Sequence, residues 1–176
     1  MQHTKDIYKK YLIGDYTYGN PTIIDRWGGD LQIGKFCSIA ENTVIMLGGN
    51  HRPDWITTYP FASFFDGFPD VKSGCPKKEK KTIIGNDVWL CRDVLILPGV
   101  SIGDGAVIGA GTVVSKDVEP YSIFVGNPGR VVKKRFSDDI IQKLLKIKWW
   151  EWGIEKIKKN IKLLCSNNID VFVKNN

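Results

Sequence analysis

The stretch from Gly48 to Phe61 carries the residues best suited to chemistry. It reads GGNHRPDWITTYPF and holds His51, Asp54 and Trp55 within five positions. Histidine is the side chain that exchanges a proton near neutral pH, and glycines let backbone approach a ligand. The aromatic rings that follow could form an apolar wall for a second substrate. The pattern therefore favours a general base in a pocket, although a lone histidine is often structural.

A metal site is the main alternative to a general base. The chain has only two histidines, His3 and His51. One set of equivalent subunits therefore cannot supply three histidine ligands to a metal unless other residues substitute. The four cysteines are far apart and form no CxxC pair. We therefore expect no metal, no zinc cluster and no disulfide, and read Cys37 and Cys91 as small buried thiols.

The elements that must position His51 are repeats of six residues. From Ile84 the sequence divides into IGNDVW, LCRDVL, ILPGVS, IGDGAV, IGAGTV and VSKDVE. The first position is always aliphatic and the fifth is always small or β-branched. This pattern predicts a triangular coil of short parallel strands, with three hexads to a turn. Earlier blocks begin at Ile33 and, more loosely, at Ile13, and the broken phase between Ile45 and Ile84 predicts an extruded loop over about 46–83.

The repeat stops after Pro128 and helical spacing replaces it. Apolar residues predict a helix over residues 137–148, with Ser137 as N-cap, and a second helix from Ile154 to Leu164. We expect a coil domain at 1–132 and a helical extension at 133–176. The helix pair is expected to cover the open end of the coil, whose last strand would otherwise expose a pairing edge.

Charge and hydropathy restrict the partners. Residues 131–176 hold 11 of the 25 Lys and Arg but only 5 of the 19 Asp and Glu. No aromatic platform or nucleic-acid module accompanies this excess, so a phosphorylated cofactor or a solvated helix face is favoured over nucleic acid. No stretch is apolar enough for a membrane span or a signal peptide. The expected compartment is the cytoplasm, without stable membrane insertion.

Several motifs together resemble one enzyme family. The hexads, NHRPDWITTYPF, GNDVWL, VSKDVEPYSIFVGNPGRVVKKRF and SDDIIQKLLKIKWWEW are similar to the xenobiotic acetyltransferase branch of the hexapeptide-repeat acyltransferases. That branch includes type B chloramphenicol and streptogramin acetyltransferases and many bacterial glycan O-acetyltransferases. The resemblance covers about Ile13 to Cys165. It implies a mainly β fold, a left-handed parallel β-helix with an extruded loop and a C-terminal helical segment, assembled as a homotrimer.

The resemblance also implies roles for individual residues. His51 would be the general base, taking the proton of an acceptor hydroxyl as it attacks the thioester of acetyl-CoA in a groove between two coils. The implied cofactor-binding residues are Trp89, Arg92, Ala110, Ser115, Lys116, Arg130 and Lys133. The implied acceptor-binding residues are Tyr18, Asp54 and Trp55, which Tyr59 joins as one of the loop rings. Each basic residue could instead be an ordinary surface charge.

The acceptor is the least determined part. The chain is shorter at its N-terminus than the drug-modifying members and differs from them between Phe61 and Lys81. The TYG, WGG and IGK segments favour a sugar or surface-glycan hydroxyl as acceptor. The alternatives are an antibiotic hydroxyl or a scaffold without catalysis, and a scaffold would need neither a base nor phosphate contacts.

Overall fold

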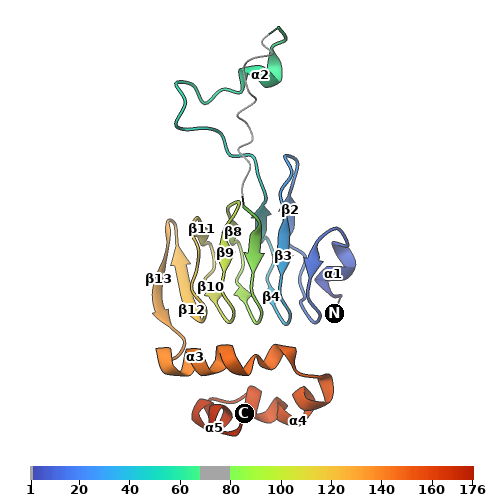
Figure 1. Ribbon diagram of the computed structural model, residues 1–176, viewed down its shortest axis with the longest axis vertical. Coiled ribbons are helices and arrows are strands. Elements are labelled where there is room, and N and C mark those ends of the chain that lie inside the picture. The colour runs from blue at the N-terminus through green and yellow to red at the C-terminus, as the bar shows by residue number, and fades with distance from the viewer. Residues whose placement is uncertain (1, 68–79) are drawn as a thin grey trace.

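The computed structural model describes residues 2–67 and 80–176, which form a three-sided coil with a protruding loop and a layer of helices (Figure 1). The first face of the coil contains β1 (Leu12–Ile13), β3 (Leu31–Ile33), β6 (Thr82–Ile84) and β9 (Ser101–Ile102). The second face contains β4 (Ser38–Ile39), β7 (Trp89–Leu90), β10 (Val107–Ile108), β12 (Ser122–Gly126) and β13 (Gly129–Lys134). The third face contains β2 (Thr22–Ile24), β5 (Val44–Met46), β8 (Leu95–Ile96) and β11 (Val113–Val114).

The hexad columns form the core as predicted. All six aliphatics of the first column are buried, at 0–1% exposure, and they stack in register from coil to coil. They are Ile84, Leu90, Ile96, Ile102, Ile108 and Val114. The fifth column, from Val88 to Val118, is buried beside them. Neighbouring coils pair as parallel strands, and the predicted left-handed parallel β-helix is confirmed.

Three corners join the faces, and two of them carry an attachment. The corner between the first and second faces, here the helix-side corner, meets the C-terminal helices. The corner between the third and first faces, the loop-side corner, emits the segment between β5 and β6 (Figure 1). The corner between the second and third faces, formed by residues 40–43, 91–94 and 109–112, is the open corner.

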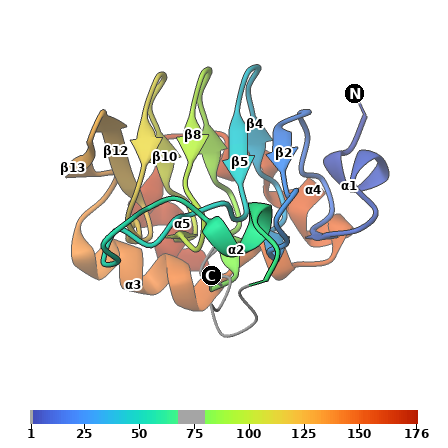
Figure 2. The ribbon, with the colours of Figure 1, turned by 90° about the horizontal axis from the view of Figure 1, so that it is seen from above.

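The C-terminal helices do not cover the end of the coil, so that expectation is wrong. They are α3 (Asp138–Ile147), the 3₁₀ turn η1 (Trp149–Glu151), α4 (Ile154–Leu164) and α5 (Ile169–Asn175), and they run along the helix-side corner (Figures 1 and 2). The end of the second face is closed by β13 instead, which pairs antiparallel with β12. Because β13 already occupies that pairing edge, the helices are free to bury their apolar faces elsewhere.

Packing explains where the helices lie. Ile141 and Leu144 of α3 join Tyr121, Trp150 and Phe172 in a buried cluster separate from the coil core. Ser137 occupies the predicted N-cap position of α3, but its side chain makes no capping hydrogen bond. The helix α5 was not predicted. Among the described residues, no helix is both long and apolar enough to cross a membrane.

The loop leaves the coil after β5 and carries the short helix α2 (Phe61–Phe64) far from the body of the molecule (Figure 1). A small helix, α1 (Thr4–Ile7), packs at the N-terminal end of the coil. Residues 68–79, which include Cys75 and much of the segment that departs from the drug-modifying enzymes, lie outside the described residues.

Candidate active site

His51 is exposed on the loop, and the structure supplies the group that orients it. The ring Nδ1 lies 2.7 Å from the carbonyl oxygen of Thr58. A carbonyl oxygen only accepts hydrogen bonds, so Nδ1 carries the hydrogen and donates. In the neutral imidazole the lone pair therefore remains on Nε2, which is the state a general base requires. Sequence reasoning did not identify this contact, since Thr58 contributes only its backbone.

Asp54 and Trp55 lie in the turn after His51 and are organised by Arg52, a residue that sequence reasoning did not single out. The Arg52 Nε donates to Asp54 Oδ1 at 2.7 Å, and the two side chains form an ion pair. The guanidinium carbon is 5.4 Å from the centre of the Trp55 ring. Asp54 is therefore a partner of Arg52, and this ion pair holds the turn next to His51.

Rings gather beyond the base. Tyr59 contacts Phe61 and Phe64, with ring centroids 4.8 and 5.6 Å apart, and Phe61 contacts Phe65 at 5.5 Å. These four residues, the loop ring cluster, are 46–69% exposed. A contiguous apolar patch of this kind on a soluble protein marks a surface that something else covers. Of the rings expected to line the acceptor site, only Tyr59 lies in this cluster, because Trp55 contacts Arg52 and Tyr18 lies on the second face of the coil. The described residues leave the cluster exposed.

Three of the predicted site residues share one row on the second face. Tyr18 pairs with Ser38, which pairs with Trp89. The row continues through Val107 and Ile123 to Lys133 on β13. Each step is one strand spacing, so Tyr18 and Trp89 lie roughly 10 Å apart. Trp89 is 52% exposed and points outward. The flat second face therefore presents an aromatic and basic row.

The other predicted cofactor residues lie at two corners and on β13. Arg92 and Ala110 are at the open corner, where the Arg92 Nε lies 3.7 Å from Asp93. Ser115 and Lys116 are at the loop-side corner, beside Asp117, which binds Lys80 at the returning end of the loop, with 2.9 Å between Lys80 Nζ and Asp117 Oδ2. Arg130 is exposed and in register with Val125. The cofactor set is thus spread around the prism.

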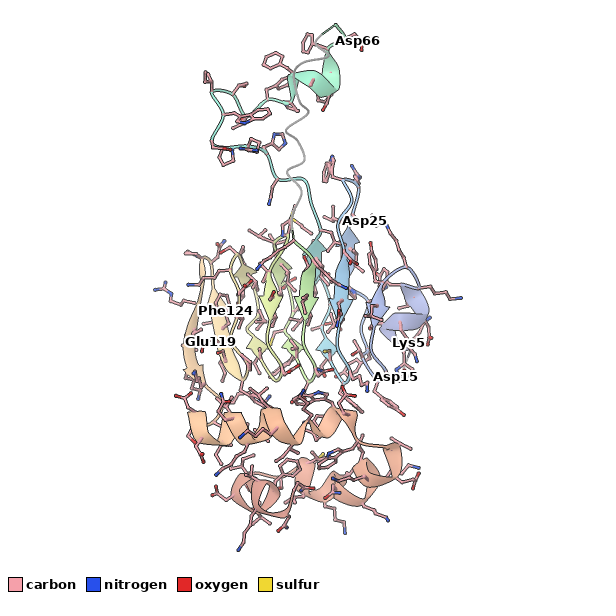
Figure 3. The ribbon with its side chains drawn as sticks, viewed as in Figure 1. Lys5, Asp15, Asp25, Asp66, Glu119 and Phe124 are labelled. Atoms are coloured by element: carbon pink, nitrogen blue, oxygen red, sulfur yellow. The ribbon has the colours of Figure 1, made fainter. Side chains whose placement is uncertain are left out.

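One chain does not bring the base to the second face. The loop-side corner joins the third and first faces, so in a three-sided prism it is opposite the second face. Figure 3 shows the loop, with Asp66 near its tip, directed away from the coil that contains Phe124. Consequently His51 and Trp89 are on opposite sides of the same molecule.

The two cysteines of the repeat, Cys37 and Cys91, are poorly suited to act as nucleophiles. Burial raises the pKa of the Cys37 thiol to about 12, and burial also raises the pKa of Cys91. Since the thiolate is the nucleophilic form, neither thiol is activated. Within residues 2–67 and 80–176, no group of three or more His, Cys, Asp or Glu side chains could hold a metal ion.

Known proteins similar to this chain are acetyltransferases. The family model described as bacterial transferase hexapeptide (six repeats) matches residues 81–116. A probable macrolide acetyltransferase of Lysinibacillus sphaericus is 53% identical over 142 residues, which cover 79% of each protein. A chloramphenicol acetyltransferase of Klebsiella aerogenes is 46% identical over 143 residues, covering 79% of this chain and 68% of that protein.

A solved structure agrees with the fold. The hexapeptide-repeat acetyltransferase of Vibrio cholerae superimposes with a TM-score of 0.56 at 26% identity, covering 71% of this chain and 62% of that one. The matches in sequence and in structure point to the same group. This chain belongs to the hexapeptide-repeat acetyltransferases of the xenobiotic acetyltransferase family, and it is an acyltransferase.

Proposed function

We propose that the protein moves an acetyl group from acetyl-CoA to a hydroxyl group of an antibiotic, with His51 as general base. The observation that carries the proposal is the hydrogen bond from His51 Nδ1 to the Thr58 carbonyl, which leaves Nε2 free to accept a proton. The loop ring cluster beside it suits an apolar, drug-sized acceptor.

In the proposed reaction, Nε2 takes the proton of the acceptor hydroxyl as its oxygen attacks the thioester carbonyl. The C–S bond then breaks, and the imidazolium returns the proton to the departing thiolate of CoA. Atoms and charges balance without an acyl-enzyme. The raised thiol pKa values of Cys37 and Cys91 agree with such direct transfer. Holding Nδ1–H on Thr58 preserves the same tautomer for each turnover.

The site is proposed to form between copies of the chain in a homotrimer. His51 and Trp89 are on opposite sides of one prism, so a second copy is required to bring a base to the aromatic and basic row. The second face with Arg130 on β13, together with Lys116 at the loop-side corner of the second copy, would then hold acetyl-CoA, with the cations at its phosphates. Three identical interfaces give three sites. Mass photometry is expected to find three times the 19.9 kDa chain.

The comparisons change the preferred acceptor. The sequence alone favoured a sugar or glycan hydroxyl. The two similar proteins described above are named for a macrolide and for chloramphenicol, and they favour the antibiotic alternative. A glycan acceptor remains the second candidate because of the TYG, WGG and IGK segments. A scaffold without catalysis has no use for a base held in one tautomer.

The test is acetyl transfer to a panel of acceptors. Thiol release from acetyl-CoA is measured with chloramphenicol, a macrolide, a streptogramin and a neutral oligosaccharide. The His51→Ala variant is expected to fold and to bind acetyl-CoA. Its kcat/KM should be lower by a factor of about 10²–10⁴, the usual contribution of general acid–base catalysis. His3→Gln, at the other histidine, serves as the control and should retain activity. Activity of His51→Ala within a few fold of the wild type would overturn the proposed base.

A further inference from the structure

The helix-side corner has a column of residues in the left-handed region, with rings at both ends and none in the middle. Its members have φ between 55° and 67° and succeed one another coil by coil. They are Tyr16, Phe36, Asp87, Gly105 and Tyr121. The rings of Tyr16 and Phe36 stack with centroids 4.8 Å apart. The two coils that present Asp87 and Gly105 therefore lack the ring that their neighbours supply.

A pocket of about 460 Å³ lies beside Asp87, between the helix-side corner and the helices, whereas the ring of Tyr121 lies against Gly105. Its coil side includes Phe36, Asp87 and Tyr121, and its helix side includes Leu144, Trp149 and Phe172. Small-molecule sites have volumes of roughly 300–1,000 Å³ and walls that are mostly apolar, with a few polar groups that fix orientation. This pocket has that size and that composition.

The polar groups at the coil side are two opposite charges. Arg135 Nη1 donates to the Gly105 carbonyl at 2.7 Å and lies 3.4 Å from Asp87 Oδ2. Its guanidinium carbon is also 5.3 Å from the centre of the Tyr121 ring. One carboxylate and one guanidinium together have no net charge. A ligand with a net charge would thus be attracted by one group and repelled by the other, whereas an uncharged ligand loses little hydration on entry.

Tyr121 adds an unused hydrogen-bonding group. The side chain is only 2% exposed, and its Oη has no hydrogen-bond partner in the part of the chain that the structure describes. A buried hydroxyl without a partner costs free energy that a bound hydroxyl group would recover. The hydroxyl group of a ligand can both accept and donate, so it can accept a hydrogen bond from Tyr121 or Arg135 and donate one to Asp87.

We propose that this coil–helix pocket binds one uncharged, largely apolar molecule that carries a hydroxyl group. The pocket lies between the coil and the C-terminal helices, which Figure 1 shows on the side of the coil away from the loop, and it uses none of the residues assigned to acetyl transfer. The proposal therefore does not depend on the proposed function and adds a second small-molecule site to the enzyme.

The test uses 2-naphthol as the probe, with naphthalene-2-sulfonate as the charged analogue of the same ring system. Calorimetric titration of the full chain is expected to show saturable binding of one 2-naphthol per chain, at least about tenfold tighter than the sulfonate. Ile161→Trp places a large side chain in the pocket wall and should abolish binding. Ile154→Trp is the matched control, because Ile154 is exposed on the same helix but does not line the pocket.

A second variant keeps the test decisive if Ile161→Trp disturbs the helices. Tyr121→Phe removes only the unpartnered Oη and should weaken 2-naphthol binding about three- to tenfold, the worth of one neutral hydrogen bond. Unchanged affinity in Tyr121→Phe would overturn the assignment of a hydroxyl ligand. Absence of saturable binding, or equal affinity in the two tryptophan variants, would overturn the site itself and mean that the pocket holds only water.

Discussion

Mixing two inactive variants should restore activity if the base and the cofactor row come from different copies. His51→Ala removes the base from the loop. Trp89→Glu places a carboxylate in the outward row of the second face, where the phosphates and pantetheine arm of acetyl-CoA are proposed to lie. Each variant alone should be nearly inactive. Because the two residues are on opposite sides of one prism, a site made from one of each needs two chains.

The size of the recovery follows from the geometry. In a closed trimer each interface takes its base from one copy and its second face from the next. A working interface needs Trp89→Glu as the base donor and His51→Ala as the face donor. At a one-to-one ratio with random assembly, these choices each have a probability of one half. Without selection about one quarter of all sites should therefore be active, and each trimer that contains both variants should have one active site out of three, as follows from trimer symmetry.

The assay is thiol release by trimers assembled from co-expressed chains with two different tags. Sequential affinity purification on both tags confirms that mixed trimers were measured, and the separately expressed variants mixed without subunit exchange are the control. Mixed trimers with no more activity than either variant would refute the shared site, since both residues would then have to act within one chain.

Three further outcomes follow from the geometry. Burial raises the pKa of Asp87 to about 6, so the native state binds its proton more tightly than the unfolded chain between pH 4 and 6. As pH rises from 4 to 7, the free energy of unfolding of the wild type should therefore fall by up to about 3 kcal/mol relative to that of Asp87→Asn. Urea unfolding measures both, and parallel pH profiles for the two proteins would contradict this. Gly105→Ala should destabilise by about 2–4 kcal/mol, because its φ is 67° and its Cβ would meet the Tyr121 ring at 2.5 Å. Gly111 has the same φ with open space around a Cβ, so Gly111→Ala should lower the free energy of unfolding by only about 1–2 kcal/mol. Thermal melts of the two variants measure the difference. Arg130→Ala should raise KM for acetyl-CoA more than KM for its analogue without the 3′-phosphate, by about tenfold, and equal effects on both would place Arg130 away from that phosphate.

The sequence was sufficient for features that repeat locally. Six aliphatics in register, from Ile84 to Val114, require an environment that recurs every six residues, and the buried interior of the coil provides it. The loop was found because its length breaks that phase. The helix α3 was found because its apolar residues have helical spacing, and it begins one residue after Ser137. His51 stood out because histidine is rare in this chain and lies where the repeat fails.

Features that neither the repeat nor a rare residue signals needed the three-dimensional structure. Arg52 and Thr58 act on the turn around the base through an ion pair and a carbonyl group, and neither has a recognisable sequence signal. The sequence predicts that the helices cover the end of the coil, and this prediction is wrong because no local pattern reveals that β13 folds back and occupies that pairing edge.

The column of rings and gaps at the helix-side corner shows the same limit most clearly. Successive members are 16 to 51 residues apart in the chain, yet they become neighbours when the coil closes. The sequence by itself determined the coil, its interruption and the candidate base, because each depends on a local period or a rare residue. Only the tertiary structure decided which corner carries the helices, where a pocket remains, and that the candidate base is opposite the aromatic and basic row of the second face. Those facts depend on contacts between residues that the chain keeps far apart.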